Sequence, residues 1–260
     1  MTGCLARIRA VVLNDLRVLK RDPVFVLVFT LMPLAFMAFT KGAFAAGLNA
    51  EFPGSNFNGS EQVVPGSAVL FSGFLVGNLG FAVFREHSWA TWDRLRASQL
   101  NTAELMAAKA VTPVLVLAVQ LGVMLGVGAL LFDLNLSGSV FAFGVVAAAL
   151  ALMEVSLGFA LLAVCRSVLQ LNAITNLGAM LLSGLGGAVT PVFLLPIWAQ
   201  RVAPLTPAYW AMKGFSEITL YGGGMADIVK PTAILVGFSV LFVAIAAFRF
   251  RAEDAKVGWV

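Results

Sequence analysis

Long apolar runs alternate along the chain with short polar segments. The runs are continuous stretches of Leu, Val, Ala, Phe and Gly, without the alternation of period two that a membrane β-barrel strand needs. Most of them reach the roughly 20 residues with which an α-helix crosses a bilayer. The pattern therefore predicts an all-α integral membrane protein with six transmembrane helices, near residues 24–44, 66–84, 110–132, 139–164, 170–195 and 232–248.

Composition indicates the same class. Hydrophobic residues make up 60% of the 260 positions and charged residues only 12%, whereas a soluble domain of this size needs a larger charged surface. No polar segment between the runs is long enough to separate two domains. We therefore expect residues 1–260 to form a single membrane domain.

The basic residues predict the orientation of the chain. With six spans and a cytoplasmic N-terminus, all but four of the 17 Lys and Arg residues fall on the cytoplasmic side, as the positive-inside rule requires. The four exceptions are Lys41, Arg201, Lys213 and Lys230. Both termini are then cytoplasmic. The net charge of +4 is explained by contact with an anionic inner leaflet, so no nucleic-acid partner is expected.

Two segments outside the spans have patterns of their own. In residues 1–22, apolar positions recur every three or four residues and basic residues take the opposite side, which predicts an amphipathic helix on the inner membrane surface. Residues 196–231 combine four prolines and three consecutive glycines with Tyr and Trp. This combination predicts an external re-entrant element, made of short helices that enter the outer leaflet and return.

Residues 85–109, REHSWATWDRLRASQLNTAELMAAK, form a charged, helix-like patch between the second and third apolar runs. Because membrane spans are predicted on both sides, the patch must lie in water. It is the part of the chain that we expect another protein to bind.

Residues of the kinds that carry catalysis or bind metals do not cluster in the sequence. The only histidine is His87, no pair of carboxylates faces another inside a span, and no metal-ligand cluster occurs. The phosphate-binding pattern GxxxxGK[ST] is missing as well, so the chain is not itself an ATPase of that type. We expect a transport or binding protein with no catalytic residues and no bound metal.

Glu154 lies near the middle of the fourth apolar run, where an ionised carboxylate costs on the order of 3 kcal/mol unless it faces water or a partner. It could bind a cationic substrate or relay a proton. A neutral glutamic acid that forms a hydrogen bond between helices is an equal alternative. Asn78, Asn172, Asn176 and Ser183 are further candidates for the same polar pathway.

Three local motifs resemble those of a known family. Pro65-Gly66 enters the second run, REHSWATWDRLRAS continues to Glu104 and Lys109, and FLLPIWAQRVAPLTPAYWAMKGF precedes the last run. In this order they resemble the membrane subunits of type-2 ABC exporters, in particular the daunorubicin-resistance-like drug and lipid permeases, over nearly the whole chain. Ala90 stands where that family commonly has Gly, and Trp210 follows Tyr209 where a small residue is frequent.

The resemblance implies a half-transporter that dimerises with a second permease chain, the same or a homologous one, in a bacterial plasma membrane. A separate ABC subunit would bind ATP and Mg, so no cofactor is expected in this chain. Residues 85–109 would be the helix that couples the two subunits, through polar and buried contacts of Arg85, Glu86, Trp89, Thr91, Trp92, Arg94, Leu95 and Arg96. The resemblance also implies that the external re-entrant element is marked by Pro196, Trp198, Pro204, Pro207 and Tyr209.

The substrate is open at this point. Apolar, Phe-rich spans suit an amphipathic drug or a lipid-like molecule, and export of a polysaccharide or glycolipid by a permease of the same type is an alternative. A proton-coupled secondary transporter that uses Glu154 would need paired repeats with discontinuous helices, which the sequence does not indicate. A membrane-embedded protease or transferase is the weakest alternative, because it lacks a paired acid, histidine or metal site.

Overall fold

A computed structural model describes residues 2–21, 24–89 and 102–249, and these residues form helices without a β-strand. The predicted all-α class is therefore confirmed. The elements are α1 (Thr2–Arg21), α2 (Val24–Glu51), α3 (Ser60–Leu75), α4 (Gly77–Ser88), α6 (Thr102–Gly122), the π-helical turn η1 (Val123–Val127), α7 (Gly128–Leu131), α8 (Val140–Val164), α9 (Val168–Leu185), the 3-10 turn η2 (Val192–Leu194), α10 (Ile197–Val202), the 3-10 turn η3 (Ala203–Leu205), α11 (Pro207–Thr219) and α12 (Met225–Arg249).

Within the described part of the chain, five helices are long and apolar enough to cross a membrane. They correspond to five of the six predicted runs and are Leu27–Glu51, Glu104–Leu131, Val140–Val164, Val168–Leu185 and Met225–Arg249. The remaining run, 66–84, is divided between α3 and α4 at Val76, so neither helix reaches the required length alone. Gly73 and Gly77 flank the break, and glycine weakens a helix interior by about 1 kcal/mol relative to alanine.

Several predicted boundaries are wrong. Helix α2 ends at Glu51 and not near 44, and α6 begins at Thr102 and not near 110. The fifth run was expected to extend to residue 195, but α9 ends at Leu185, where Gly186 and Gly187 follow and Gly187 adopts a φ of +89° that favours glycine. The last run was expected to begin at 232, but α12 begins at Met225 and includes Pro231. Pro231 is the seventh residue of α12, beyond the first four whose N–H groups have no intrahelical acceptor, so α12 continues through it with one backbone hydrogen bond fewer.

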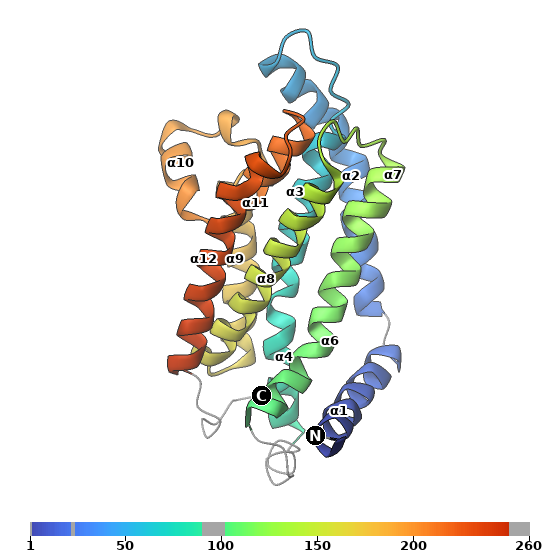
Figure 1. Cartoon of the computed structure of the whole chain (residues 1–260), viewed down its shortest axis with the longest axis vertical. Coiled ribbons are helices and arrows are strands. Elements are labelled where there is room, and N and C mark those ends of the chain that lie inside the picture. The colour runs from blue at the N-terminus through green and yellow to red at the C-terminus, as the bar shows by residue number, and fades with distance from the viewer. Residues whose placement is uncertain (1, 22–23, 90–101, 250–260) are drawn as a thin grey trace.

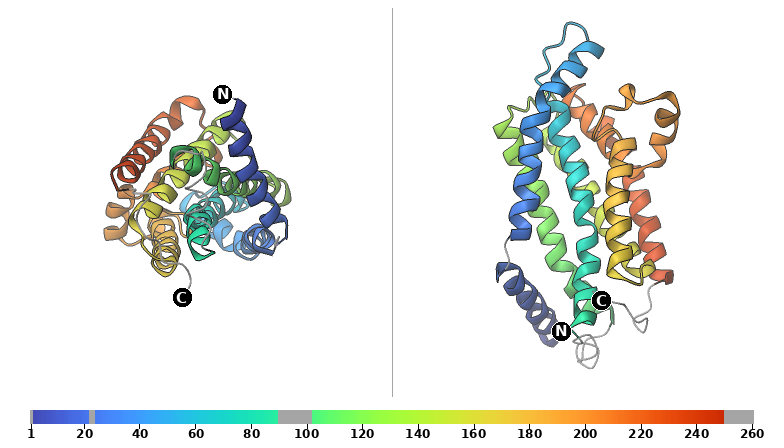
Figure 2. Two further views of the ribbon diagram at one scale, coloured as in Figure 1. Left: turned by 90° about the horizontal axis from the view of Figure 1, so that it is seen from below. Right: turned by 180° about the vertical axis from the view of Figure 1, so that it is seen from behind.

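The long helices run roughly alongside one another as a bundle (Figure 1). At one end of the bundle α1 crosses beneath it at an angle, next to α6 and the tip of α4 (Figures 1 and 2). At the opposite end α10 and α11 fold back beside α9 and α12, and the end of α2 projects with the loop that follows it. We call the first the α1 end and the second the α10 end.

The segments 1–22 and 196–231 are largely helical in the structure. Helix α1 is present over almost the whole of 1–22 and packs against α6. The segment 196–231 contains α10, η3 and α11 before α12 begins, and Thr206 caps α11 by accepting a hydrogen bond from the Tyr209 N–H at 3.3 Å. The location of α1 at the membrane surface and of α10 and α11 in the outer leaflet stays a prediction.

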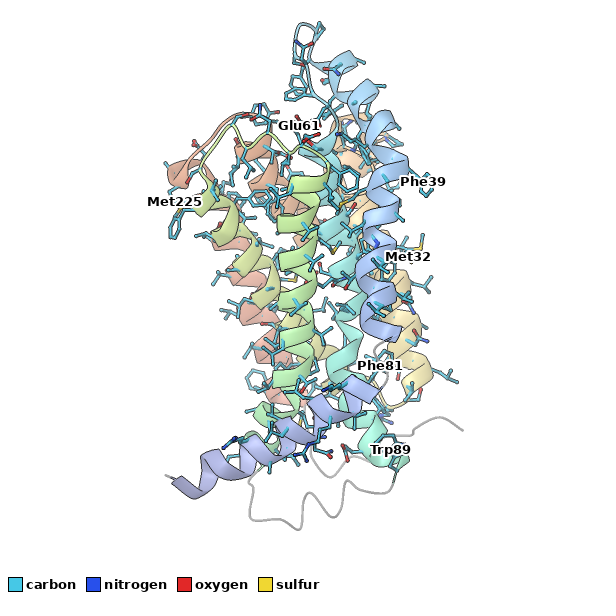
Figure 3. All side chains as sticks on the ribbon, turned by 90° about the vertical axis from the view of Figure 1, so that its right-hand side faces the viewer. Met32, Phe39, Glu61, Phe81, Trp89 and Met225 are labelled. Atoms are coloured by element: carbon cyan, nitrogen blue, oxygen red, sulfur yellow. The ribbon has the colours of Figure 1, made fainter. Side chains whose placement is uncertain are left out.

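Helix α3 is the most buried helix of the bundle. Every residue from Ser60 to Ser72 is buried, and α3 packs against α2, α6, α8, α9 and α11. In contrast, α2 turns large apolar side chains such as Met32 and Phe39 away from the bundle (Figure 3). An apolar exterior around a partly polar interior suits a bundle whose surroundings are lipid.

The packing of α3 explains why a glycine follows Pro65 at position 66. A Cβ atom built on Gly66 would lie 2.4 Å from the carbonyl oxygen of Ala188, in the turn that follows α9. Only a residue without a side chain permits this approach of α3 to the turn.

We therefore expect Gly66→Ala to destabilise the protein by about 1–3 kcal/mol, because backbone must move to admit the methyl group. Gly126→Ala is the matched control, since no atom lies within 4 Å of its Cβ position. Thermal unfolding of the purified protein, followed by intrinsic fluorescence, measures both. Equal melting temperatures for the two variants would contradict the close packing at Gly66.

Candidate functional site

A buried lysine joins three helices at the α1 end of the bundle. Lys109 of α6 is 2% exposed, and its Nζ donates to Asp15 Oδ1 of α1 at 3.0 Å and to Glu86 Oε1 of α4 at 2.5 Å. Asp15 and Glu86 are themselves 3% and 6% exposed. We call these three residues the ion-pair junction.

The ion-pair junction ties α1, α4 and α6 to one another. Buried charges are costly to remove from water, and a buried cation between two carboxylates offsets much of that cost only while all three groups stay in place. Separation of α4 from α1 or α6 would therefore leave at least one buried charge without its partner. Glu86 and Lys109 also stand on either side of residues 90–101 in the sequence, so the junction anchors both ends of the predicted coupling segment.

The residues predicted to couple the chain to a partner are only partly described. Thr91, Trp92, Arg94, Leu95 and Arg96 lie outside the described residues, as does the side chain of Arg85.

Two of the predicted coupling residues are described. Trp89 directly follows α4 and is 57% exposed (Figure 3). Glu86 is turned inward to Lys109, so it holds the segment from inside the protein. The sequence did not reveal that Lys109 is the centre of a junction, although acidic residues on both α1 and α4 offered partners for a lysine at the start of an apolar helix.

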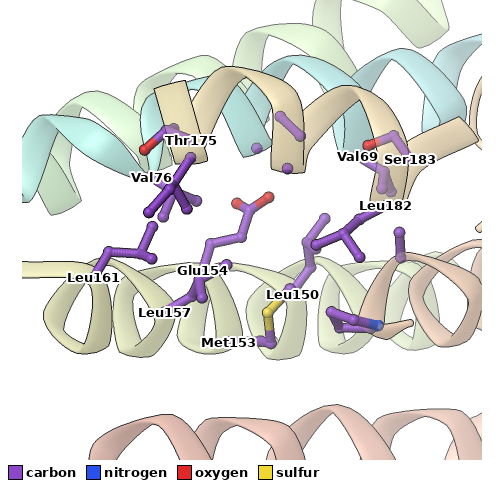
Figure 4. A pocket seen from close by; sticks show the side chains of 16 residues that line it. Val69, Val76, Leu150, Met153, Glu154, Leu157, Leu161, Thr175, Leu182 and Ser183 are labelled. Atoms are coloured by element: carbon purple, nitrogen blue, oxygen red, sulfur yellow. The ribbon is translucent and has the colours of Figure 1, made fainter. Parts of the chain in front are cut away.

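A second polar site lies inside the bundle. Glu154 of α8 is 3% exposed and its side chain points into a cavity of about 110 Å³ between α3, α8 and α9 (Figure 4). Glu154 Oε1 lies 2.7 Å from the hydroxyl oxygen of Ser72 on α3. Its other oxygen, Oε2, has no hydrogen-bond partner, and neither has the buried Thr175 hydroxyl on the α9 wall of the same cavity. We call this the Glu154 cavity.

Ser72 meets only part of the hydrogen-bonding capacity of the Glu154 carboxyl group. Its hydroxyl oxygen also lies 2.5 Å from the carbonyl oxygen of Ala68, one turn earlier in α3. A hydroxyl carries one proton, so Ser72 donates either to Ala68 or to Glu154, and in the first case only a neutral Glu154 can donate in turn to the Ser72 oxygen. The structure thus leaves a buried carboxyl group with at most one donated hydrogen bond, where most buried polar groups have theirs satisfied.

The predicted polar pathway divides into two groups. Ser183 is buried and lines the Glu154 cavity, as expected for residues of one pathway. Asn172 and Asn176 do not line it; Asn176 is exposed and donates a hydrogen bond to Asn172 on α9. The Asn78 side chain lies outside the described part. Asn172 and Asn176 therefore belong to the outer surface of α9.

The Glu154 cavity is suited to a small polar or cationic occupant. Its volume corresponds to about three or four molecules of liquid water. It is several-fold smaller than the roughly 300–1,000 Å³ of pockets that enclose a drug-sized molecule. A whole drug molecule does not fit beside Glu154 in this conformation.

A larger cavity of about 390 Å³ opens at the α10 end, between the start of α3, the turn after α9 and one face of α11. Gln62 lines this cavity and donates a hydrogen bond to the Gly187 carbonyl oxygen at 2.7 Å. Tyr209, Lys213 and Glu217 of α11 line it as well. Of the other predicted re-entrant residues, Pro207 is buried at the start of α11 and Pro204 accepts a hydrogen bond from the Trp210 indole at 2.8 Å. Trp198 is 65% exposed and Pro196 precedes α10.

No group of three metal-ligating side chains occurs in the part of the chain that the structure describes. The polar sites found there are the ion-pair junction, the Glu154 cavity and the cavity at the α10 end. They lie at successive depths along α3 and α4.

The family profile and the curated relatives that match this chain are all of one kind, transporter proteins of the membrane. Residues 6–220 match the profile of the family described as ABC-2 type transporter. The chain is 26% identical over 187 residues to the linearmycin resistance permease protein LnrN of Bacillus subtilis. This match covers 72% of this chain and 48% of that protein. It is 28% identical over 140 residues to the probable multidrug ABC transporter permease YbhR of Escherichia coli, covering 53% of this chain and 36% of that protein. The chain thus spans about half the length, or less, of the curated relatives it matches.

The ion-pair junction predicts a specific loss of stability. Lys109→Met leaves the buried carboxylates of Asp15 and Glu86 without their shared cation and should lower the free energy of unfolding by about 3–5 kcal/mol. Lys41→Met is the matched control: Lys41 Nζ donates at 2.7 Å to one backbone carbonyl, that of Phe132, and its loss should cost about 1 kcal/mol. Denaturant unfolding in detergent compares the two, and equal losses would show that the junction contributes no more than a single hydrogen bond.

Proposed function

The chain belongs to the ABC-2 type transporter family, and on that premise we propose that it is the permease of an ATP-driven exporter of amphipathic drugs or lipid-like molecules. The observation that carries the proposal is the family match over residues 6–220, in a chain whose sequence has no phosphate-binding loop of its own. The protein is a multi-pass membrane protein, and uphill transport needs an energy source. A separate ABC subunit would supply it by binding ATP and Mg.

The partner ATPase binds residues 85–109 in this proposal. A short helix seated in a groove of the ATPase can transmit the closure of that subunit as a rigid-body motion. The ion-pair junction supports this role, because it joins α4 and α6, the helices that border the segment, to α1. Force applied to the segment would reach three helices at once.

We propose that α3 and α4 together form the sixth crossing, in the orientation that the basic residues predict. The α1 end is then cytoplasmic, with both termini there, and α1 lies on the inner surface of a bacterial plasma membrane. The α10 end is external and contains the re-entrant element. The whole chain forms one membrane domain.

A second permease chain, the same or a homologous one, covers α9. The outer surface of α9 combines the Asn172–Asn176 pair with exposed Leu177, Met180 and Leu181. Amide side chains that face hydrocarbon are costly, whereas amides between helices form hydrogen bonds. A neighbouring permease chain offers such partners, and the apolar residues around the pair provide the packing surface.

The names of the relatives support a drug as the substrate, since one relative is a linearmycin resistance permease and the other a probable multidrug permease. The cavity at the α10 end favours a second candidate, a glycolipid or polysaccharide. Phe193, Tyr209 and Tyr221 line it together with Lys213 and Glu217, and aromatic rings with polar groups between them suit hydroxylated ligands. The match to the ABC-2 type transporter family does not support the alternative of a proton-coupled transporter.

The coupling segment gives the test. Arg94→Glu together with Arg96→Glu should weaken association with the ATPase by about thirtyfold, or 2 kcal/mol, if these side chains lie at the centre of the interface. Arg166→Glu, in the short turn between α8 and α9 on the same side of the membrane, is the matched control.

Copurification with the ABC ATPase that the wild-type chain retains from cell membranes, and ATP-dependent export of a fluorescent amphiphile from vesicles, measure the effect. Wild-type association and export in the double variant would contradict docking at this segment. An unaltered chain that neither binds an ATPase nor exports on addition of ATP would overturn the proposed function itself.

A further inference from the structure

We propose that the Glu154 cavity binds the primary ammonium end of a cationic amphiphile, and that this occupant acts on the break between α3 and α4. The inference rests on the proposed export function and names a substrate class for it. Three features of the cavity carry it: an unsatisfied carboxyl group, a small volume and a position at the helix break.

The charge of the occupant follows from the polar atoms that face the cavity. Glu154 Oε2 and the Thr175 hydroxyl are buried and have no partner, and the other polar side chain on the wall is that of Ser183. No Lys, Arg or His lines the cavity among the described residues. A positively charged group with several donors would pair with Glu154 Oε2 and still have donors left for the hydroxyl groups on the wall, and a primary ammonium group has three such donors.

The size and apolar lining of the cavity restrict which substituents the nitrogen of the ammonium group can carry. Val69, Leu150, Met153 and Leu157 line the rest of the wall, which suits the methylene groups next to a charged end. About 110 Å³ accepts an ammonium group, which is about as large as one water molecule, together with a few methylenes. A bulky quaternary ammonium group neither fits this volume nor donates hydrogen bonds.

The position of the cavity connects the occupant to the coupling segment. Gly73 and Val76 line the cavity at the point where α3 ends at Leu75 and α4 begins at Gly77. Helix α4 continues from this break to Glu86 in the ion-pair junction. A group that fills the cavity therefore contacts the pivot of the segment that ends at the junction, and its presence favours one angle between α3 and α4.

The test uses the purified full-length chain in nanodiscs of phosphatidylcholine, with empty nanodiscs as the background. Three probes share one alkyl chain: dodecylammonium, dodecyltriethylammonium and the uncharged N-dodecylacetamide. Retention of each tritiated probe is measured for the wild type, for Glu154→Gln, for Thr175→Val and for Ser156→Ala. Ser156 is the matched control, because it is buried on the same helix, donates to the Leu152 carbonyl at 2.7 Å and does not line the cavity.

Dodecylammonium should bind the wild type at least about tenfold more tightly than the other two probes do, since it alone forms charge-assisted hydrogen bonds there. Glu154→Gln should remove that preference, Thr175→Val should reduce it several-fold, and Ser156→Ala should leave it unchanged. Equal binding of dodecylammonium and dodecyltriethylammonium by the wild type overturns the inference, as does an unchanged preference in a Glu154→Gln protein of normal monodispersity. The wild-type comparison decides the question even where a variant fails to fold.

The result separates this inference from the proposed function. ATP-driven export of uncharged amphiphiles without any effect of Glu154→Gln on ammonium binding would remove the inference and leave the function. Glu154-dependent binding in a chain that associates with no ATPase would support the site and remove the function.

Discussion

The arrangement of the bundle depends on the polar groups that α3 and α4 carry through an apolar interior. At the α10 end, Gln62 donates to the Gly187 carbonyl, and the Thr219 hydroxyl donates at 3.0 Å to the Glu61 carbonyl. At middle depth Ser72 contacts Glu154, and at the α1 end Glu86 contacts Lys109. A buried polar group that loses its partner costs roughly 1–3 kcal/mol. Each contact therefore fixes one neighbouring element to the same central pair of helices.

Helices α3 and α4 together therefore extend from the contacts at the α10 end to those at the α1 end. The α10 end of α3 is held by close packing, since Gly66 admits no side chain against the Ala188 carbonyl. The pair has a break at Val76, and a cavity lies beside that break. Packed helices move as rigid bodies about a few pivot residues. The structure thus has a closely packed segment of α3 at the α10 end, an interruption at Val76 beside the Glu154 cavity, and a segment of α4 that reaches Lys109.

Much of the fold could be predicted from local patterns, because a membrane span needs a continuous apolar run and an interfacial helix needs one apolar side. The break between α3 and α4 was missed, since hydropathy is insensitive to two glycines inside an apolar run. The end of α9 was misplaced for a related reason: residues 186–195 are apolar, yet Gly187 turns the chain.

The candidate sites depend on contacts between distant residues, which no local pattern reveals. Glu154 was recognised from its place in a span, but its proximity to Ser72, 82 positions away, and its separation from Asn172 and Asn176 required the packing of α3, α8 and α9. Likewise Asp15 and Lys109 are 94 positions apart.

If an occupant of the Glu154 cavity acts on the helices around it, transport requires the α3 and α9 walls of that cavity to separate near Gly73 and Ala179, about two turns along α3 from the close packing at Gly66. A Cβ atom built on Gly73 would lie 3.3 Å from the Ala179 Cβ, close to the separation of about 3.8 Å in a disulfide. In a chain with Cys4 and Cys165 replaced by serine, Gly73→Cys with Ala179→Cys can therefore be oxidised to link the two helices, and ATP-driven export is then measured with the partner ATPase before and after reduction. We expect the oxidised protein to bind the ATPase without exporting, and reduction to restore export. Export at the reduced rate by fully cross-linked protein would contradict this expectation.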